Sequence, residues 1–267
     1  MSAGEPQDGF PVVLTFHGDL AIFLKRHERG RKVRRVLREK TAIKDAIEAC
    51  GVPHPEVDLI LCDGVAVQFT HQLTRDAVLD VHPVGSRPEG DLAVRLQRRR
   101  IRRFVADGHL GKLVRNLRLL GIDVAYSPIV DDAELIRIGC SEDRAVLTRD
   151  RRLLMHSAVR DGYFPRSQMP DEQTIEVLRR FELGGLTEPY TRCLRCNGLL
   201  CVVEKSSIEK QLEPLTREYY EVFRRCTNCG NVYWSGSHFS KLEARVARLL
   251  AALSARPIDD DRAKNWA

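Results

Sequence analysis

The sequence lacks long apolar segments. No stretch of its 267 residues approaches the roughly 18 consecutive apolar residues that a membrane-spanning helix requires. The first ten residues, MSAGEPQDGF, include acidic side chains and no apolar stretch, so they do not match a secretory signal. Internal repeats and low-complexity tracts are also missing. These absences predict a cytoplasmic protein.

Composition and charge then narrow the class of protein. Hydrophobic residues make up 43% of the chain and charged residues 30%, which excludes disorder of the whole chain, and the length predicts two domains with room for a small third module. The net charge is +6, but residues 1–90 carry −1, whereas residues 91–185 carry +4 and residues 186–267 carry +3. This uneven positive charge suggests a polyanionic partner.

The first part of the chain, residues 10–85, predicts a small domain of its own. Thr41 is expected to cap its helix, and Asp63-Gly64 is a hairpin signal because both residues tolerate positive φ angles. The expected strands are 12–16, 32–38, 57–62, 65–69 and 78–84, with a helix over 42–50. This order resembles a ubiquitin-like β-grasp domain. Residues 86–99 read as a basic linker.

Residues 100–185 have a different pattern, in which predicted strands and helices alternate. We expect strands over 101–106, 123–126 and 145–148, and helices over 110–120, 133–138 and 171–181. Such alternation is typical of a parallel sheet with helices on both faces. The predicted fold class is therefore α/β in this domain.

Eight cysteines are present, and four of them form two C-x-x-C pairs in residues 186–254. Four thiolates at this spacing suit a tetrahedral structural zinc ion with no open position for chemistry. Gly198 and Gly230 are expected to relieve the backbone near the pairs, and His238 to lie near the start of a last helix, 239–253. The predicted zinc ligands are Cys193, Cys196, Cys226 and Cys229. The four scattered cysteines, Cys50, Cys62, Cys140 and Cys201, are expected to be ordinary buried thiols.

Acidic side chains follow the predicted strands of the α/β domain, and no P-loop, G-x-G-x-x-G motif or catalytic serine motif accompanies them. Asp107 and Asp150 come after two strands, and Asp131, Asp132 and Glu134 lie at a helix start. Functional groups gather at the carboxyl ends of parallel strands, and clustered carboxylates favour Mg²⁺ or Mn²⁺. The structural alternative is that these acids are helix caps or partners of neighbouring arginines.

Basic residues surround this acidic set. They either contact phosphates of a nucleic acid or form an ordinary solvated surface. The candidates are Arg99, Arg100, Arg102, Arg103, Lys112, Arg115 and Arg118.

Longer runs of residues resemble a known family. The motifs D-x-x-L-G-K-L at 107–113, L-T-R-D at 147–150 and Y-W-x-G-S-H at 233–238 occur with both cysteine pairs. Together they resemble the bacterial "Mut-seven C-terminal" RNase family, a PIN-like nuclease domain followed by a four-cysteine zinc ribbon. Residues 10–85, including VDLILCDGVAV, resemble the ubiquitin-like domain often fused in front of it.

The resemblance implies a metal-dependent ribonuclease that hydrolyses RNA with metal-activated water. It implies that one or two Mg²⁺ or Mn²⁺ ions are held by Asp107, by Asp132 or Glu134, and by Asp150. Lys112 and Arg149 would meet phosphate oxygens. Products would carry a 5′-phosphate and a 3′-hydroxyl. Tyr233 and Trp234 offer a stacking surface for an unpaired base, or pack the ribbon instead.

The expected partner is RNA, with structured RNA such as tRNA as the candidate, and the β-grasp domain could dock a protein. Two other functions compete with this hypothesis. One is a non-catalytic adaptor that binds RNA or the ribosome, in which the carboxylates are structural. The other is a toxin-type PIN nuclease, which the length of the chain disfavours because such toxins are usually single domains.

Overall fold

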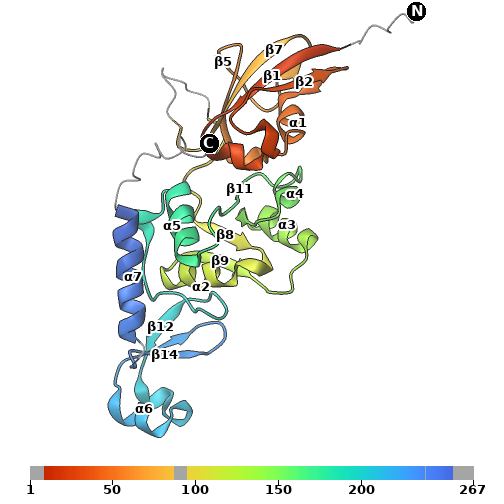
Figure 1. Cartoon of the computed structure of the whole chain (residues 1–267). Coiled ribbons are helices and arrows are strands. Elements are labelled where there is room, and N and C mark those ends of the chain that lie inside the picture. Colours follow the sequence, from red (N-terminus) through yellow and green to blue (C-terminus); the bar gives the residue numbers. More distant parts are fainter. Residues whose placement is uncertain (1–8, 87–94, 238, 255–267) are drawn as a thin grey trace, which may run out of the picture. The chain divides into compact units, whose positions relative to one another are not determined.

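The computed structural model describes residues 9–86, 95–237 and 239–254 (Figure 1). The chain divides into two compact units. The first unit joins the described residues up to Ile101 with Asp131–Phe164, and the second joins Arg102–Val130 with the described residues from Pro165 onward. The part of the chain placed in the structure holds no helix that is both long and apolar enough to cross a membrane.

The first unit begins with a mixed five-stranded sheet in the order β2-β1-β7-β4-β5, in which β1 and β7 are parallel. A short pair, β3 and β6, lies outside this sheet. The strands are β1 (Phe10–Phe16), β2 (Val33–Leu37), β3 (Thr41–Ala42), β4 (Val57–Cys62), β5 (Val65–Ala66), β6 (Gln72–Leu73) and β7 (Ala77–Pro83). The helical segments are η1 (Gly18–Phe23), η2 (Arg26–Glu28), α1 (Ile43–Glu48) and η3 (His54–Glu56).

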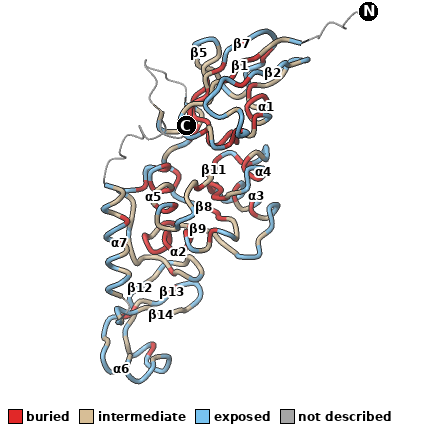
Figure 2. The backbone as a smooth tube through the Cα atoms, viewed as in Figure 1, coloured by how far each residue is buried: buried red, intermediate tan, exposed pale blue. Residues whose placement is uncertain are grey.

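Burial explains why α1 forms where it does. Ile43, Ala46 and Ile47 are spaced for one helix face, and all three belong to the core under the sheet (Figure 2). The helix ends ahead of Gly51, whose φ of +90° suits glycine. The predicted cap is wrong: Ala42 precedes the helix, and the Thr41 hydroxyl bonds to Glu39 O instead.

The hairpin prediction holds, but its second strand is short. Asp63 and Gly64 have φ angles of +50° and +80°, as a tight hairpin turn requires. The returning strand β5 covers only two of the five residues expected to be extended. The predicted linker is also not a simple spacer: Leu96 and Gln97 donate backbone hydrogen bonds to Asp58 of β4. Residues 87–94 of that linker lie outside the described residues.

The first unit also contains α3 (Asp132–Ser141), β10 (Ala145–Leu147), α4 (Arg151–Leu154) and β11 (Gly162–Tyr163). Strands β10 and β11 pair in parallel. Arg98 ties this segment to the chain that follows the N-terminal domain, because its guanidinium contacts both Asp143 and Asp161 at 2.9 and 2.5 Å.

The second unit contains the parallel pair β8 and β9 and the helices α2, α5 and α7. Strands β12, β13 and β14 form an antiparallel sheet. The bounds are β8 (Arg103–Ala106), η4 (Gly108–Leu110), α2 (Gly111–Leu119), β9 (Asp123–Tyr126), α5 (Pro170–Arg180), η5 (Gly184–Leu186), β12 (Leu200–Val203), η6 (Lys205–Ser207), η7 (Glu209–Gln211), α6 (Pro214–Tyr219), β13 (Phe223–Cys226), β14 (Val232–Trp234) and α7 (Phe239–Ser254).

The predicted fold class is confirmed in its three parts: a ubiquitin-like mixed sheet, a parallel sheet with helices, and a C-terminal antiparallel sheet that carries the cysteine pairs. The prediction for the scattered cysteines is wrong for two of them. Cys50 is buried and Cys62 is half-buried, but Cys140 and Cys201 are exposed.

Candidate metal centre and acidic residues

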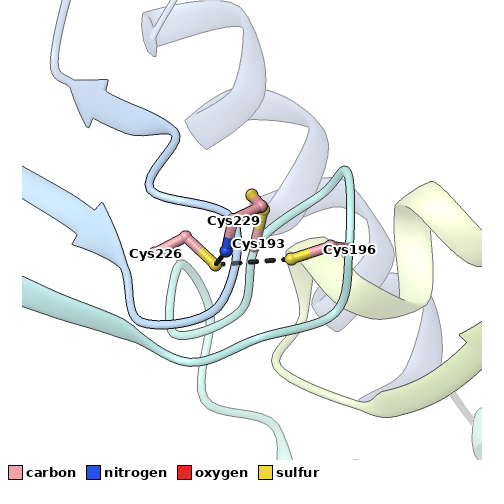
Figure 3. Close-up of side chains that lie close together, drawn as sticks. All are labelled: Cys193, Cys196, Cys226 and Cys229. Carbon is pink, nitrogen blue, oxygen red and sulfur yellow. Dashed lines mark hydrogen bonds between the residues drawn. The ribbon is translucent and has the colours of Figure 1, made fainter.

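The four paired cysteines come together at one point of the second unit (Figure 3). Their sulfur atoms all lie within 4.8 Å of one another, with Cys196 and Cys226 at 3.4 Å and Cys193 and Cys229 at 3.7 Å. A tetrahedral zinc ion about 2.3 Å from each sulfur would set the sulfurs about 3.8 Å apart. The donor set and its spacing therefore fit a structural zinc ion.

Two matched turns bring the sulfurs together. Each turn passes through a left-handed residue, Asn197 with φ +71° and Gly230 with φ +72°. Gly198 has a different role from the one predicted for it: a Cβ there would come within 2.8 Å of the Cys226 sulfur, so only glycine leaves room for the ligand. Sequence reasoning found the glycines but not the conformational role of Asn197.

The four thiols strongly affect one another's pKa values when no cation offsets the negative charge of the thiolates. Burial raises the pKa of Cys196, but hydrogen bonds from Gly198 N–H and the neighbouring thiols outweigh it and lower this pKa to about 6. The pKa of Cys229 rises to about 12, because desolvation and the Cys196 and Cys193 sulfurs outweigh a hydrogen bond from Asn231 N–H. A divalent cation would remove this competition, because it favours the thiolate form of every ligand.

The ribbon is anchored to β9 and α2 by buried polar groups. Asn197 accepts a hydrogen bond from Val124 N at 3.1 Å and donates one to Asp123 Oδ1 at 2.8 Å. Arg118, only 3% exposed, donates to Val124 O and to the carbonyls of Leu194 and Arg195 in the first cysteine turn. Burial lowers the pKa of Arg118, and the nearby cysteines oppose that shift.

Arg118 was predicted to bind RNA, and the structure shows another role for its guanidinium. Its spacing from Lys112 and Arg115 is that of a single charged helix face, and those two residues are exposed. Arg118 instead lies under the ribbon, where its donors satisfy backbone carbonyls. Nothing in the local pattern distinguishes it, because two of the carbonyls that it meets, those of Leu194 and Arg195, lie 76 and 77 residues further along the chain.

Tyr233 also has a role within the ribbon. Its hydroxyl lies 3.1 Å from the Cys193 sulfur and accepts a hydrogen bond from Leu194 N. Burial and the Cys193 sulfur raise the pKa of Tyr233 to about 12. Trp234 is 40% exposed, so it keeps a face for contact with a base. His238 lies outside the described residues.

The predicted acidic residues cap helical segments. Asp107 follows β8 directly and accepts a bond from His109 N. Asp150 lies just beyond β10 and accepts bonds from Arg152 N at 2.7 Å and Leu153 N at 3.3 Å, and Asp131 caps α3 through Glu134 N. All three aspartates therefore have the helix-capping role of the structural alternative, and Asp131 and Asp150 fill it through Oδ1.

The acids at the start of α3 differ in what they contact. Glu134 is held by Arg137 through two hydrogen bonds of 2.5 and 2.7 Å, and these bonds lower the pKa of Glu134. Asp132, one residue inside the helix, is exposed. Asp107 belongs to the second unit, and Asp132, Glu134 and Asp150 belong to the first. Within the described ranges, the group of side chains that meets metal-ligand spacing is the cysteine cluster.

The remaining predicted RNA contacts lie on several elements. Arg99 contacts the buried Asp58 at 3.4 Å, and Arg103 lies 3.9 Å from Asp123. Arg100 and Arg102 are exposed, and Arg149 places its guanidinium 5.6 Å from the centre of the Phe164 ring. RNA binding by these residues stays a prediction.

Comparison with known families supports the resemblance seen in the motifs. Residues 102–246, more than half of the chain, match the family described as Mut7-C RNAse domain, and residues 10–88 match Mut7-C ubiquitin. No curated protein and no solved structure matches the chain significantly. The family match implies ribonuclease activity and an RNA substrate. The chain therefore belongs to the Mut7-C RNase domain family, with a Mut7-C ubiquitin domain ahead of its RNase domain.

Proposed function

We propose that this protein is a metal-dependent ribonuclease that hydrolyses phosphodiester bonds of structured RNA such as tRNA. The observation that carries the proposal is the position of Asp107 and Asp150. Asp107 follows β8, which pairs in parallel with β9, and Asp150 follows β10, which pairs in parallel with β11. Functional groups gather at the carboxyl ends of parallel strands. Membership of the RNase family supports the reaction class.

The contacts of the acids suggest which of them would hold Mg²⁺ or Mn²⁺. Asp150 uses Oδ1 for both of its capping bonds, which leaves Oδ2 for a cation. Asp132 is exposed at the first turn of α3, whereas both carboxylate oxygens of Glu134 are engaged by Arg137. We therefore assign the cation to Asp107, Asp132 and Asp150.

The bound cation would supply an activated water and neutralise charge that develops on the phosphate. Lys112, exposed on the first turn of α2, would contact a phosphate oxygen, as would Arg149 beside Asp150. Arg99, Arg100, Arg102, Arg103 and Arg115 would contact the RNA backbone, and Trp234 an unpaired base. The zinc ion would hold the ribbon together and take no part in the reaction.

A non-catalytic RNA-binding adaptor is the second candidate. The capping bonds made by Asp107 and Asp150 favour it, because they give both carboxylates a structural role that needs no cation. The two candidates make opposite predictions for Asp→Asn variants. An asparagine side chain still caps a helix, but it is a poor ligand for Mg²⁺.

The test is incubation of the zinc-loaded protein with total cellular RNA in Mn²⁺, in Mg²⁺ and in EDTA. We expect wild type to shorten discrete RNA species only with a divalent cation. Asp107→Asn should lose cleavage and keep RNA affinity, whereas Asp45→Asn, at an exposed position of α1, should cleave like wild type. Intact RNA in every condition, with binding retained, would support the adaptor instead.

A further inference from the structure

The ubiquitin-like domain contacts the part of the RNase domain that contains Arg149 and Asp150. The ubiquitin-like domain and this part of the RNase domain belong to the first unit, and Figure 1 shows α4 and β11 beside the N-terminal domain. Phe164, which follows β11, packs against the core of the ubiquitin-like domain and meets Phe23 edge-on with ring centres 5.4 Å apart. Phe164 of the RNase domain thus packs against the apolar core of the ubiquitin-like domain.

Buried polar groups fix the same contact. Glu56, 3% exposed, accepts a hydrogen bond from Phe164 N at 2.6 Å. His54, 6% exposed, has Nε2 2.6 Å from Val159 O, and because a carbonyl only accepts, the ring must donate there. Its Nδ1 is held by Glu48 at 2.7 Å. Buried hydrogen bonds of this kind fix geometry, because breaking one leaves a buried group without a partner.

One line of contacts runs from this interface to Asp150. Arg151, the first residue of α4, donates a hydrogen bond from Nη1 to Phe23 O at 2.9 Å. Helix α4 has only four residues, too few to be stable alone, so its position depends on such anchors and on the burial of Leu153 and Leu154. The first turn of α4 in turn supplies the N–H groups that orient the Asp150 carboxylate.

A second line of contacts runs to Arg149. Its guanidinium lies over the ring of Phe164, 5.6 Å from the ring centre. That ring is itself held by Phe23 and by the bond from Phe164 N to Glu56. Asp150 and Arg149 are therefore each connected to the ubiquitin-like domain through one intervening residue, Arg151 for Asp150 and Phe164 for Arg149.

We propose that the ubiquitin-like domain is a working part of the nuclease, in which Arg151 and Glu56 are positioning residues for Asp150 and Arg149. The inference rests on the proposed function, because it assumes that Asp150 and Arg149 act in hydrolysis. A domain that merely recruits partners would need no contact with Arg151 and Phe164, which hold Asp150 and Arg149. A displacement of about 1 Å in a reacting group costs on the order of a hundredfold in rate, so loss of these anchors lowers kcat.

The experiment compares six variants of the full, zinc-loaded chain with wild type: Arg151→Ala, Arg151→Lys, Glu56→Ala, Glu56→Gln, the control Arg152→Ala, and Asp150→Asn as the test of the proposed site itself. Arg152 neighbours Arg151 on α4, and its side chain is exposed. The readouts are kcat and KM on RNA, the Mn²⁺ concentration for half-maximal rate, and the Tm.

We expect Arg151→Ala and Glu56→Ala to lower kcat about tenfold to a hundredfold with KM nearly unchanged, and to raise the Mn²⁺ requirement. Arg151→Lys and Glu56→Gln should restore most of the rate, because lysine still donates to Phe23 O and glutamine still accepts from Phe164 N. Arg152→Ala should match wild type.

Two results would overturn the inference while the proposed function stands. In the first, Arg151→Ala and Glu56→Ala match Arg152→Ala although Asp150→Asn is inactive. In the second, both alanine variants lose activity only in proportion to a lower Tm, and the conservative variants do not rescue kcat. Wild-type cleavage by Asp150→Asn would instead contradict the proposed function itself, and the inference with it.

Discussion

Arg118 offers a sharp test of how the ribbon is held in place. Its guanidinium makes four hydrogen bonds, two to Val124 O and one each to Leu194 O and Arg195 O. Arg118→Met keeps much of the apolar volume and removes every donor. The perturbation therefore isolates the polar anchor between α2, β9 and the first cysteine turn.

The magnitude follows from the three carbonyl oxygens that lose their partner. A buried carbonyl without its hydrogen bond costs about 1–2 kcal/mol, which gives about 3–6 kcal/mol for three. Removal of a buried charge recovers part of this cost, so we expect a net loss of about 2–4 kcal/mol. Four thiolates around Zn²⁺ also carry a net negative charge, so loss of the nearby cation should weaken zinc binding.

The assay is thermal unfolding of the zinc-loaded protein together with zinc release to a competing chelator. The matched control is Arg115→Met on the exposed side of the same helix, which should change stability by less than about 0.5 kcal/mol. Equal Tm values and equal zinc release for Arg118→Met and Arg115→Met would refute the anchoring role.

Three further predictions address the metal, the RNA surface and pH. Cys226→Ser should reduce zinc from about one ion per chain, as metal analysis would show; full zinc retention would contradict the four-cysteine site. Lys112→Ala should weaken RNA binding and reduce the salt dependence of log Kd by about one, and an unchanged slope would remove Lys112 from the phosphate contacts. The hydrogen bond from Arg35 lowers the pKa of Glu28 below 4.5, so the stability that this pair adds is complete above pH 4.5 and is lost as the pH falls through the lower, folded-state pKa. Glu28→Gln should remove that part of the pH dependence of Tm, and identical acid profiles would contradict it.

The sequence predicted those features that depend on local spacing. Two C-x-x-C pairs can direct four sulfurs at one point wherever the connecting chain runs, so the cysteine cluster was predictable. Strand β9 was predicted to the residue, because Gly121 and Asp123 bound it clearly. Asp107 and Asp150 were placed correctly after strands for the same reason.

The features that were missed depend on distant parts of the chain. The burial of Arg118 and the anchoring by Asn197 need partners more than 70 residues away. Strand β11 has two residues and α4 has four, which is too short for any periodicity to appear. The contacts of Glu56 and His54 with residues beside β11 could not be predicted from the sequence, because each joins residues more than 100 positions apart.

The end groups of the product test most directly the claim that this protein hydrolyses RNA with metal-activated water. A short synthetic RNA that wild type cleaves in Mn²⁺ would be analysed by mass spectrometry. Hydrolysis by metal-activated water predicts a 5′-phosphate and a 3′-hydroxyl, with no product in EDTA. Products ending in a 2′,3′-cyclic phosphate that form equally in EDTA would show attack by the RNA's own 2′-hydroxyl and would contradict the account.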